Sequence, residues 1–120
     1  MLPYVLAVTG ASAQPLAERS LKLLLANDRK VHLVLSRGAH EVFRAEQGLA
    51  IPVDPEQQIR FWRERLEVET GELICHRWND QSSSIASGSY RTKAMVIVPC
   101  SMGTVGRINA GIATDLIERC

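Results

Sequence analysis

Short apolar runs that end in small or hydroxylated residues occur three times along the chain. The runs are Tyr4–Thr9, Val31–Leu35 and Ala94–Pro99, and each is bounded by Gly, Pro or Ser. Continuous apolar runs of this length are typical of strands that are buried on both faces of a parallel sheet. The pattern therefore predicts three buried strands.

Helical spacing of apolar residues separates these runs. Helical patterns cover Pro15–Ala26, Ala39–Gln47, Glu56–Glu69, Val105–Ala113 and Thr114–Cys120, and Leu73–Trp78 is a candidate for one more short strand. Pro suits the first turn of a helix, because the N–H that it lacks would be unpaired there. The repeated order of strand, turn and helix predicts one α/β domain over residues 1–120, built on a parallel sheet.

A polar stretch interrupts the pattern between the last two strands. The sequence "NDQSSSIASGSY" from Asn79 to Tyr90 has the composition of a loop. Loops of this length in a compact domain are more often functional than not. We therefore expect this loop to contribute to a site.

Composition excludes several classes of function. The chain has 120 residues, 46% of them hydrophobic and 22% charged, with a net charge of +1. This balance favours a globular domain and argues against binding to nucleic acid or anionic membranes. No apolar run approaches the roughly 20 residues of a membrane span, and no basic leader precedes the first apolar run. Cys75, Cys100 and Cys120 show no CxxC pairing, so we expect no zinc site, no disulfide framework and a cytoplasmic setting.

Small polar residues follow all three apolar strands. They are Gly10-Ala11-Ser12, Ser36 and Ser101 to Thr104. Ligands of open parallel sheets bind outside the carboxyl ends of the strands, and backbone N–H groups at helix starts favour phosphate. Each serine alone could be only a helix cap or strand end. Their recurrence at three strand ends predicts a phosphate-bearing, nucleotide-like ligand.

Other catalytic patterns fit less well. "TGAS" and Ser36-Arg37 resemble the cofactor loop of NAD(P) dehydrogenases, but residues 13–17 lack the further glycines, and Tyr90 and Lys93 are three residues apart. No P-loop sequence is present. His32 lies within an apolar strand and is interpreted as structural, and His40 and His76 have no triad context. Cys100 could have a lowered pKa at a helix start, or it could be a packing residue.

Five segments together resemble one family, the flavin prenyltransferases of the UbiX type. They are "AVTGAS", "VHLVLS", "ASGSY", "AMVIVPCSMGT" and "INAGIATDLIER", and they extend over most of the chain, from Val5 to Arg119. The resemblance implies a Rossmann-like flavoprotein fold, an open parallel sheet with helices on both faces. The related FMN-dependent cysteine decarboxylases carry a different turn after the third apolar strand and are the alternative.

The resemblance also implies a reaction and its partners. Members of the family bind reduced FMN and join to its N5 and C6 a dimethylallyl group from dimethylallyl phosphate, without a metal. The prenylated FMN serves UbiD-type decarboxylases of the ubiquinone pathway. Members usually form homo-oligomers, commonly dodecamers, with the flavin site between subunits.

Matching positions suggest roles for residues of this chain. Gly10, Ala11, Ser12 and Ser36 would bind FMN together with a second turn made by Ser101, Met102, Gly103 and Thr104. Ser12 and Glu46 would be catalytic, and Arg119 would bind the phosphate of the prenyl donor. From the residues alone, Glu46 has weaker support, because a single glutamate on a helix is a surface residue far more often than a catalytic one.

The chain departs from the family in two places. Ala13-Gln14-Pro15 follows Ser12 where the family usually has Gly-Ala, so a positive φ at Ala13 would be strained. Family chains also continue beyond "LIER", so we expect a truncated form. For 120 residues alone, the alternative to an enzyme is weak FMN binding or an assembly role without activity.

Overall fold

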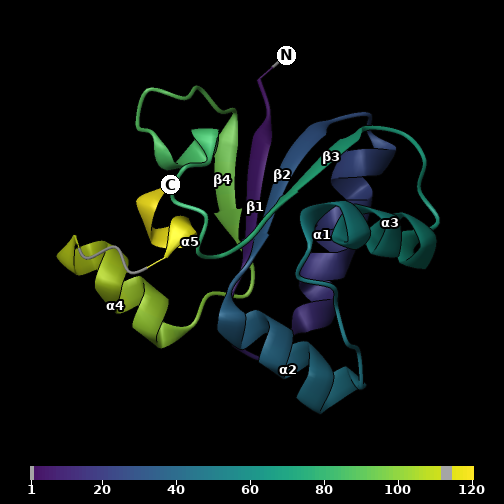
Figure 1. Cartoon of the computed structure of the whole chain (residues 1–120), viewed down its shortest axis with the longest axis horizontal. Coiled ribbons are helices and arrows are strands. Elements are labelled where there is room, and N and C mark those ends of the chain that lie inside the picture. Colours follow the sequence, from purple (N-terminus) through teal and green to yellow (C-terminus); the bar gives the residue numbers. More distant parts are fainter. Residues whose placement is uncertain (1, 112–114) are drawn as a thin grey trace.

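A four-stranded parallel sheet forms the centre of the computed structural model, which describes residues 2–111 and 115–120 (Figure 1). The strands are β1 (Tyr4–Val8), β2 (Lys30–Leu35), β3 (Glu72–His76) and β4 (Ala94–Ile97), in the order β3-β2-β1-β4. All three neighbouring pairs are parallel. The predicted parallel α/β architecture is therefore confirmed, including the short strand that begins near Leu73.

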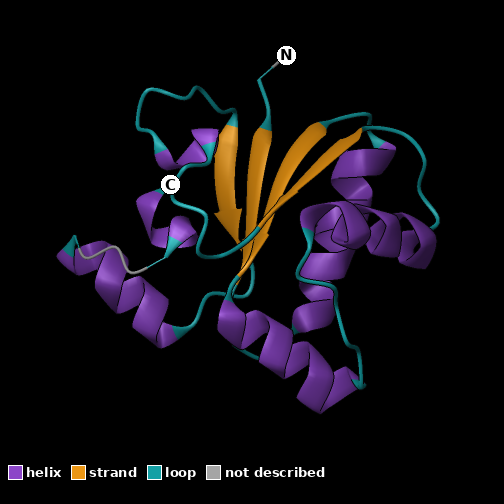
Figure 2. Ribbon diagram, viewed as in Figure 1, coloured by secondary structure: helices purple, strands orange, loops and turns teal. Residues whose placement is uncertain are grey.

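Three helices cover one face of the sheet: α1 (Gln14–Ala26), α2 (Arg37–Gln47) and α3 (Pro55–Leu66) (Figure 2). Their buried side chains form one apolar cluster with those of β1, β2 and β3. Phe43 of α2 and Trp62 of α3 meet edge to face within it, with ring centroids 5.9 Å apart. This cluster is the larger part of the core.

The opposite face has a thinner cover. The short helices η1 (Ser84–Ala86) and α5 (Leu116–Arg119) place Ile85, Leu116 and Ile117 against Val5 and Val34. Helix α4 (Met102–Ala110) lies beside α5, away from the sheet (Figure 1). Helices on both faces were predicted, and this is confirmed. No helix in the described part of the chain has the length and apolar character of a membrane span.

The apolar run Ala94–Pro99 contains the predicted strand, β4, but the prediction that this strand is buried is wrong. Strand β4 lies at one edge of the sheet, and its residues alternate between exposed and half-buried. Val96 is paired with Leu6 of β1, but its side chain is 38% exposed because the cluster beneath α1–α3 does not extend to it. An apolar run thus marks a strand without revealing whether both faces are covered.

The boundaries of the last helices also differ from the prediction. Helix α4 begins at Met102 rather than Val105, because the Ser101 hydroxyl accepts a hydrogen bond from the Thr104 N–H and caps the helix. Residues 112–114, at the junction of the helices predicted over Val105–Ala113 and Thr114–Cys120, lie outside the described residues.

The polar loop from Asn79 to Tyr90 is fixed to the sheet by histidines. His32 Nδ1 lies 2.8 Å from His76 Nε2, His32 Nε2 lies 2.9 Å from the Tyr90 hydroxyl, and Ser83 Oγ lies 3.0 Å from His76 Nδ1. Burial, followed by the charges of His76 and Lys30, lowers the pKa of His32 to about 4. His32 is therefore neutral at pH 7, in agreement with the structural role predicted for it.

Candidate functional site

The carboxyl ends of β1, β2 and β4 lie side by side, where Figure 1 shows α2 and α4 beginning. Hydrogen bonds continue the strand pairing past the strands: Ser36 N–H donates to Val8 O at 2.8 Å, and Thr9 N–H donates to Pro99 O at 3.1 Å. The chain therefore brings together the three turns that the sequence singled out. We call residues 9–13 the β1 turn and residues 98–101 the β4 turn.

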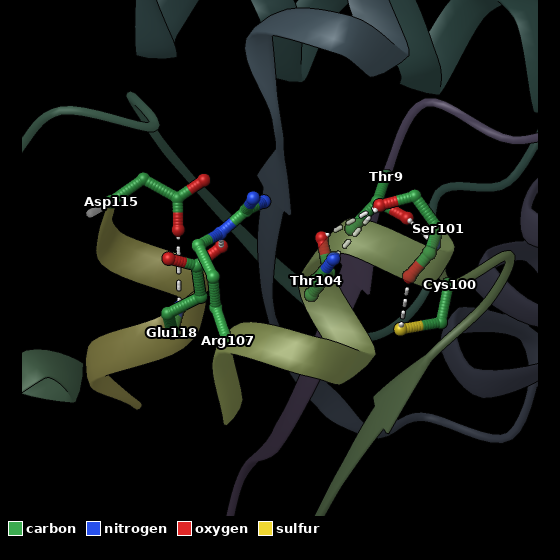
Figure 3. A network of polar contacts seen from close by, with 7 residues as sticks. All are labelled: Thr9, Cys100, Ser101, Thr104, Arg107, Asp115 and Glu118. Carbon is green, nitrogen blue, oxygen red and sulfur yellow. Dashed lines mark hydrogen bonds and ion pairs between the residues drawn. The ribbon is translucent and has the colours of Figure 1, made fainter. Parts of the chain in front are cut away.

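Thr9 joins these two turns. Its hydroxyl donates to Pro99 O at 2.8 Å and accepts from the Ser101 N–H at 2.6 Å, and the residue is 1% exposed. Figure 3 shows Thr9 next to Ser101, whose side chain is directed toward Thr104. Thr9 was not among the predicted site residues, although a hydroxyl at the end of a buried strand needs such hydrogen-bond partners.

Gly10 allows the β1 turn to approach the start of α2. A Cβ at Gly10 would lie 2.9 Å from the carbonyl carbon of Gly38, which is closer than real Cβ atoms come. The glycine is thus required by backbone contact rather than by an unusual dihedral angle. Gly38, the other member of this contact, was not predicted as part of the site.

Ala13 is strained, as we expected if its φ were positive. Its φ is 80° and its ψ is 35°, in the left-handed region, and it begins α1 without a side-chain cap. Such a conformation costs a non-glycine residue roughly 1–3 kcal/mol. The surrounding structure must therefore hold the β1 turn in place.

Gln14 is the residue that holds it. Its side chain is completely buried, and Nε2 donates to Ala11 O at 2.8 Å and to Thr9 O at 3.1 Å. The Oε1 atom has no hydrogen-bond partner among the described residues. Gln14 therefore fixes two carbonyl groups of the β1 turn from inside the core.

Ser36 and Ser101 are both helix caps. Ser36 Oγ accepts from the Ala39 N–H at 3.0 Å, and Ser101 Oγ accepts from the Thr104 N–H at 3.2 Å and contacts Thr104 Oγ1 at 2.9 Å. Both serines are thus helix caps, and a capping role does not exclude binding. A capping hydroxyl accepts one hydrogen bond and still carries a proton for a ligand oxygen.

A cavity of about 280 Å³ lies between the turns. It is smaller than the roughly 300–1,000 Å³ of pockets that enclose a whole drug-sized ligand, so it fits a phosphate and the groups next to it. Gly10, Ser36, Ser101 and Thr104 were predicted for the site, and the cavity is lined by these four together with Arg37, Gly38, Trp78, Arg107 and Asp115. Two larger depressions, of about 590 and 660 Å³, lie along α3 and α1, away from the strand ends.

Ser12 and Glu46 lie together outside this cavity. Ser12 Oγ donates to Glu46 Oε1 at 3.3 Å, and both residues are exposed. One residue precedes α1 and the other is near the end of α2, so the fold creates this pair across 34 positions. The two residues predicted as catalytic are therefore neighbours.

The remaining predicted residues are not brought to the cavity. Met102 is 84% exposed on α4, and Arg119 is exposed on α5. Ala11 is half-buried in the β1 turn, and Gly103 lies beneath the guanidinium of Arg107. These positions stay predictions.

Polar groups that the sequence did not reveal add charge to the cavity. Asp115 caps α5 through a 3.1 Å bond from the Glu118 N–H, and burial raises the pKa of its carboxyl. Arg107 donates from Nε to Glu118 Oε2 at 2.6 Å (Figure 3). Within the described residues, no three His, Cys, Asp or Glu side chains are close enough to hold a metal ion.

The fold and the strand-end site define a class of protein, and a family comparison agrees. Residues 2–120 match the model of the flavoprotein family, and the chain belongs to this family. The flavin prenyltransferase UbiX of Synechocystis sp. is 48% identical over 118 residues, which are 98% of this chain and 57% of that protein. The predicted resemblance to flavin prenyltransferases is thus confirmed, and the chain spans just over half the length of the relative.

Two solved structures share the arrangement of the chain. AnUbiX (PadA1), determined in complex with FMN and dimethylallyl pyrophosphate, has a TM-score of 0.77 at 30% identity, over 98% of this chain and 55% of that one. A dodecameric FMN-dependent UbiX-like decarboxylase from Escherichia coli O157:H7 has a TM-score of 0.74 at 30% identity, over 98% and 57%. The bound FMN and dimethylallyl pyrophosphate and the dodecameric assembly are properties of those two proteins.

Proposed function

We propose that this chain carries the FMN-binding part of a flavin prenyltransferase, which joins a dimethylallyl group from dimethylallyl phosphate to reduced FMN. The observation that supports this proposal most strongly is that the three turns line one cavity. The chain that forms this cavity is 48% identical to a flavin prenyltransferase. We further propose a cytoplasmic homo-oligomer that supplies prenylated FMN to a UbiD-type decarboxylase.

The residues of the cavity suit the phosphate end of FMN. The cavity lies at the starts of α2 and α4, where the helix dipoles favour an anion, and Ser36, Ser101 and Thr104 add hydroxyl groups. Because the cavity is too small for the whole nucleotide, the flavin ring would extend beyond it, and Ser12 would be near the ring. FMN itself supplies the electron-rich centre for the alkylation.

Glu46 and Ser12 are the groups that can move a proton. The Ser12 hydroxyl lies 3.3 Å from the Glu46 carboxylate, so it can pass its own proton to Glu46 as it gains one from a flavin nitrogen or carbon. Both side chains are exposed in this chain, so water must be excluded by whatever covers them during the reaction. Loss of the phosphate from the donor needs cationic partners, for which Arg119 is the proposed residue in this chain.

The test is an anaerobic reaction of the 120-residue chain with reduced FMN and dimethylallyl phosphate. We expect a shifted flavin spectrum and a flavin product heavier by one prenyl unit. Glu46→Gln should lower the rate by about 10²–10⁴-fold, whereas Glu64→Gln, an exposed carboxylate on α3, should leave it unchanged.

The other outcomes separate the alternatives. Bound FMN without a prenylated product would show that this chain only binds flavin and would reject the enzyme proposal for it. Release of CO2 from a peptidyl or pantothenoyl cysteine would instead identify a cysteine decarboxylase.

A further inference from the structure

The side chain of Arg107 lies back across the first turn of its own helix. A Cβ at Gly103 would lie 3.2 Å from Arg107 Nη1 and 3.7 Å from Nη2, so the guanidinium covers the start of α4. Helical side chains point toward the helix N-terminus, which explains the direction. Gly103 has no side chain that would push the guanidinium away. The arginine thus reaches the turn formed by Ser101 and Thr104.

Glu118 fixes this position. Its side chain is fully buried, and its Oε2 accepts from Arg107 Nε at 2.6 Å, while the Arg107 side chain is 39% exposed (Figure 3). A buried carboxylate requires a partner, so the contact constrains the arginine rather than merely accompanying it. Glu118 holds the guanidinium at Nε, while Nη1 and Nη2 lie over Gly103 beside the cavity.

The charges around the cavity differ in how well they are fixed. Arg37 at its rim is 78% exposed and pairs loosely with Glu41 at 3.8 Å. Asp115 adds a carboxylate, which disfavours an anion close to it. Arg107 is therefore the cation that is both partly buried and held in place, and a planar guanidinium suits the paired oxygens of a phosphate.

Resting on the proposed function, we propose that Arg107 recognises the phosphate of the flavin nucleotide and that Glu118 is the residue that positions it. Asp115 then accepts hydrogen bonds from the hydroxyl groups of the ribityl chain. The arrangement gives the nucleotide a direction within the cavity, with the phosphate at α4 and the ring toward Ser12. It also makes the chain selective for FMN over riboflavin, which lacks the phosphate.

The experiment titrates the 120-residue chain with FMN and with riboflavin and follows the quenching of flavin fluorescence. We expect tighter binding of FMN by the unaltered chain. Arg107→Gln should weaken FMN binding by about 10–100-fold, the loss expected when one charged hydrogen-bonding partner is removed, and should leave riboflavin binding unchanged. Arg60→Gln, an exposed arginine on α3, is the matched control and should change neither.

Since Arg107→Gln leaves a buried carboxylate without this partner, the double variant Arg107→Gln/Glu118→Gln is measured in parallel, with circular dichroism to verify folding. If either variant that lacks Arg107 folds and still prefers FMN to riboflavin as strongly as the unaltered chain, the role of Arg107 is rejected and the proposed function is unaffected. An unaltered chain that binds neither flavin would overturn both. Glu118→Gln alone should lower the affinity for FMN less than Arg107→Gln does. If Glu118→Gln lowered the affinities for FMN and riboflavin equally, Glu118 would have a role in folding rather than in positioning Arg107.

Discussion

The β1 turn and the β4 turn lie side by side at the same edge of the sheet, yet they are held in opposite ways. The β1 turn enters α1 through a strained Ala13 without a cap, and a buried Gln14 secures it from inside the core. The β4 turn enters α4 through a relaxed Ser101 that caps its own helix. One turn thus depends on tertiary contacts and the other on its local sequence. We expect the two to respond differently to the following changes.

The largest effect should follow from Gln14→Glu. A carboxylate at this position would face Thr9 O and Ala11 O in a fully buried site, so we expect a loss of at least about 3 kcal/mol at pH 7. Denaturant unfolding measures it. Gln14→Met, which removes the two bonds without adding charge, should cost less. Because burial raises the pKa of the new carboxyl, the deficit relative to the unaltered chain should shrink as the pH falls. A deficit that is independent of pH would contradict this.

Acid should next distinguish the sheet face covered by η1 and α5 from the face covered by α1, α2 and α3. The pKa of His32 is about 4 in the folded chain and 6.5 without the fold, so the unfolded chain binds the proton first. Stability should be complete above about pH 6.5 and fall as the pH drops toward 4. Hydrogen exchange should show loss of protection at Ile85 and Leu116 before Leu21 and Leu25. Simultaneous loss at all four amides would count against a local effect.

Ser101→Ala should have a smaller effect, confined to the β4 turn. Loss of the cap of α4 should cost about 1 kcal/mol and should weaken FMN binding, since the same hydroxyl faces the cavity. Thermal unfolding and flavin titration measure the two effects. Ser20→Ala, which removes a hydroxyl from the interior of α1, is the control and should change flavin affinity little. An unchanged flavin affinity for Ser101→Ala would remove this hydroxyl from the site.

The smallest effect should be a gain, from Ala13→Gly. Glycine adopts the φ of 80° without strain, but it also gains freedom in the unfolded chain, so we expect a net stabilisation of at most about 1 kcal/mol. The melting temperature should rise slightly. Ala26→Gly, at the last residue of α1, should lower it instead. If Ala13→Gly also lowered the melting temperature, the strain assigned to the β1 turn would be absent.

Much of the architecture could be predicted because its causes are local. The apolar runs marked β1, β2 and β4, and the serines at the ends of β2 and β4 cap α2 and α4 as residues of their type commonly do. Even the strain at Ala13 could be anticipated, because alanine stands where the family usually has glycine. The burial of β4 was predicted wrongly, because a run of apolar residues can form either an edge strand or a central strand, and the sequence pattern does not distinguish them.

The sequence by itself therefore determined the strands, most of the helices and the polar residues at the strand ends. Only the tertiary structure decided that Gly10 meets Gly38, that Thr9 joins two turns, and that Glu118 holds Arg107 over Gly103. The physical reason is the separation in sequence of the residues that interact. Helix caps and strand patterns depend on residues within one or two turns of one another, whereas the cavity depends on parallel strands that bring residues 10, 36 and 101 together at their carboxyl ends.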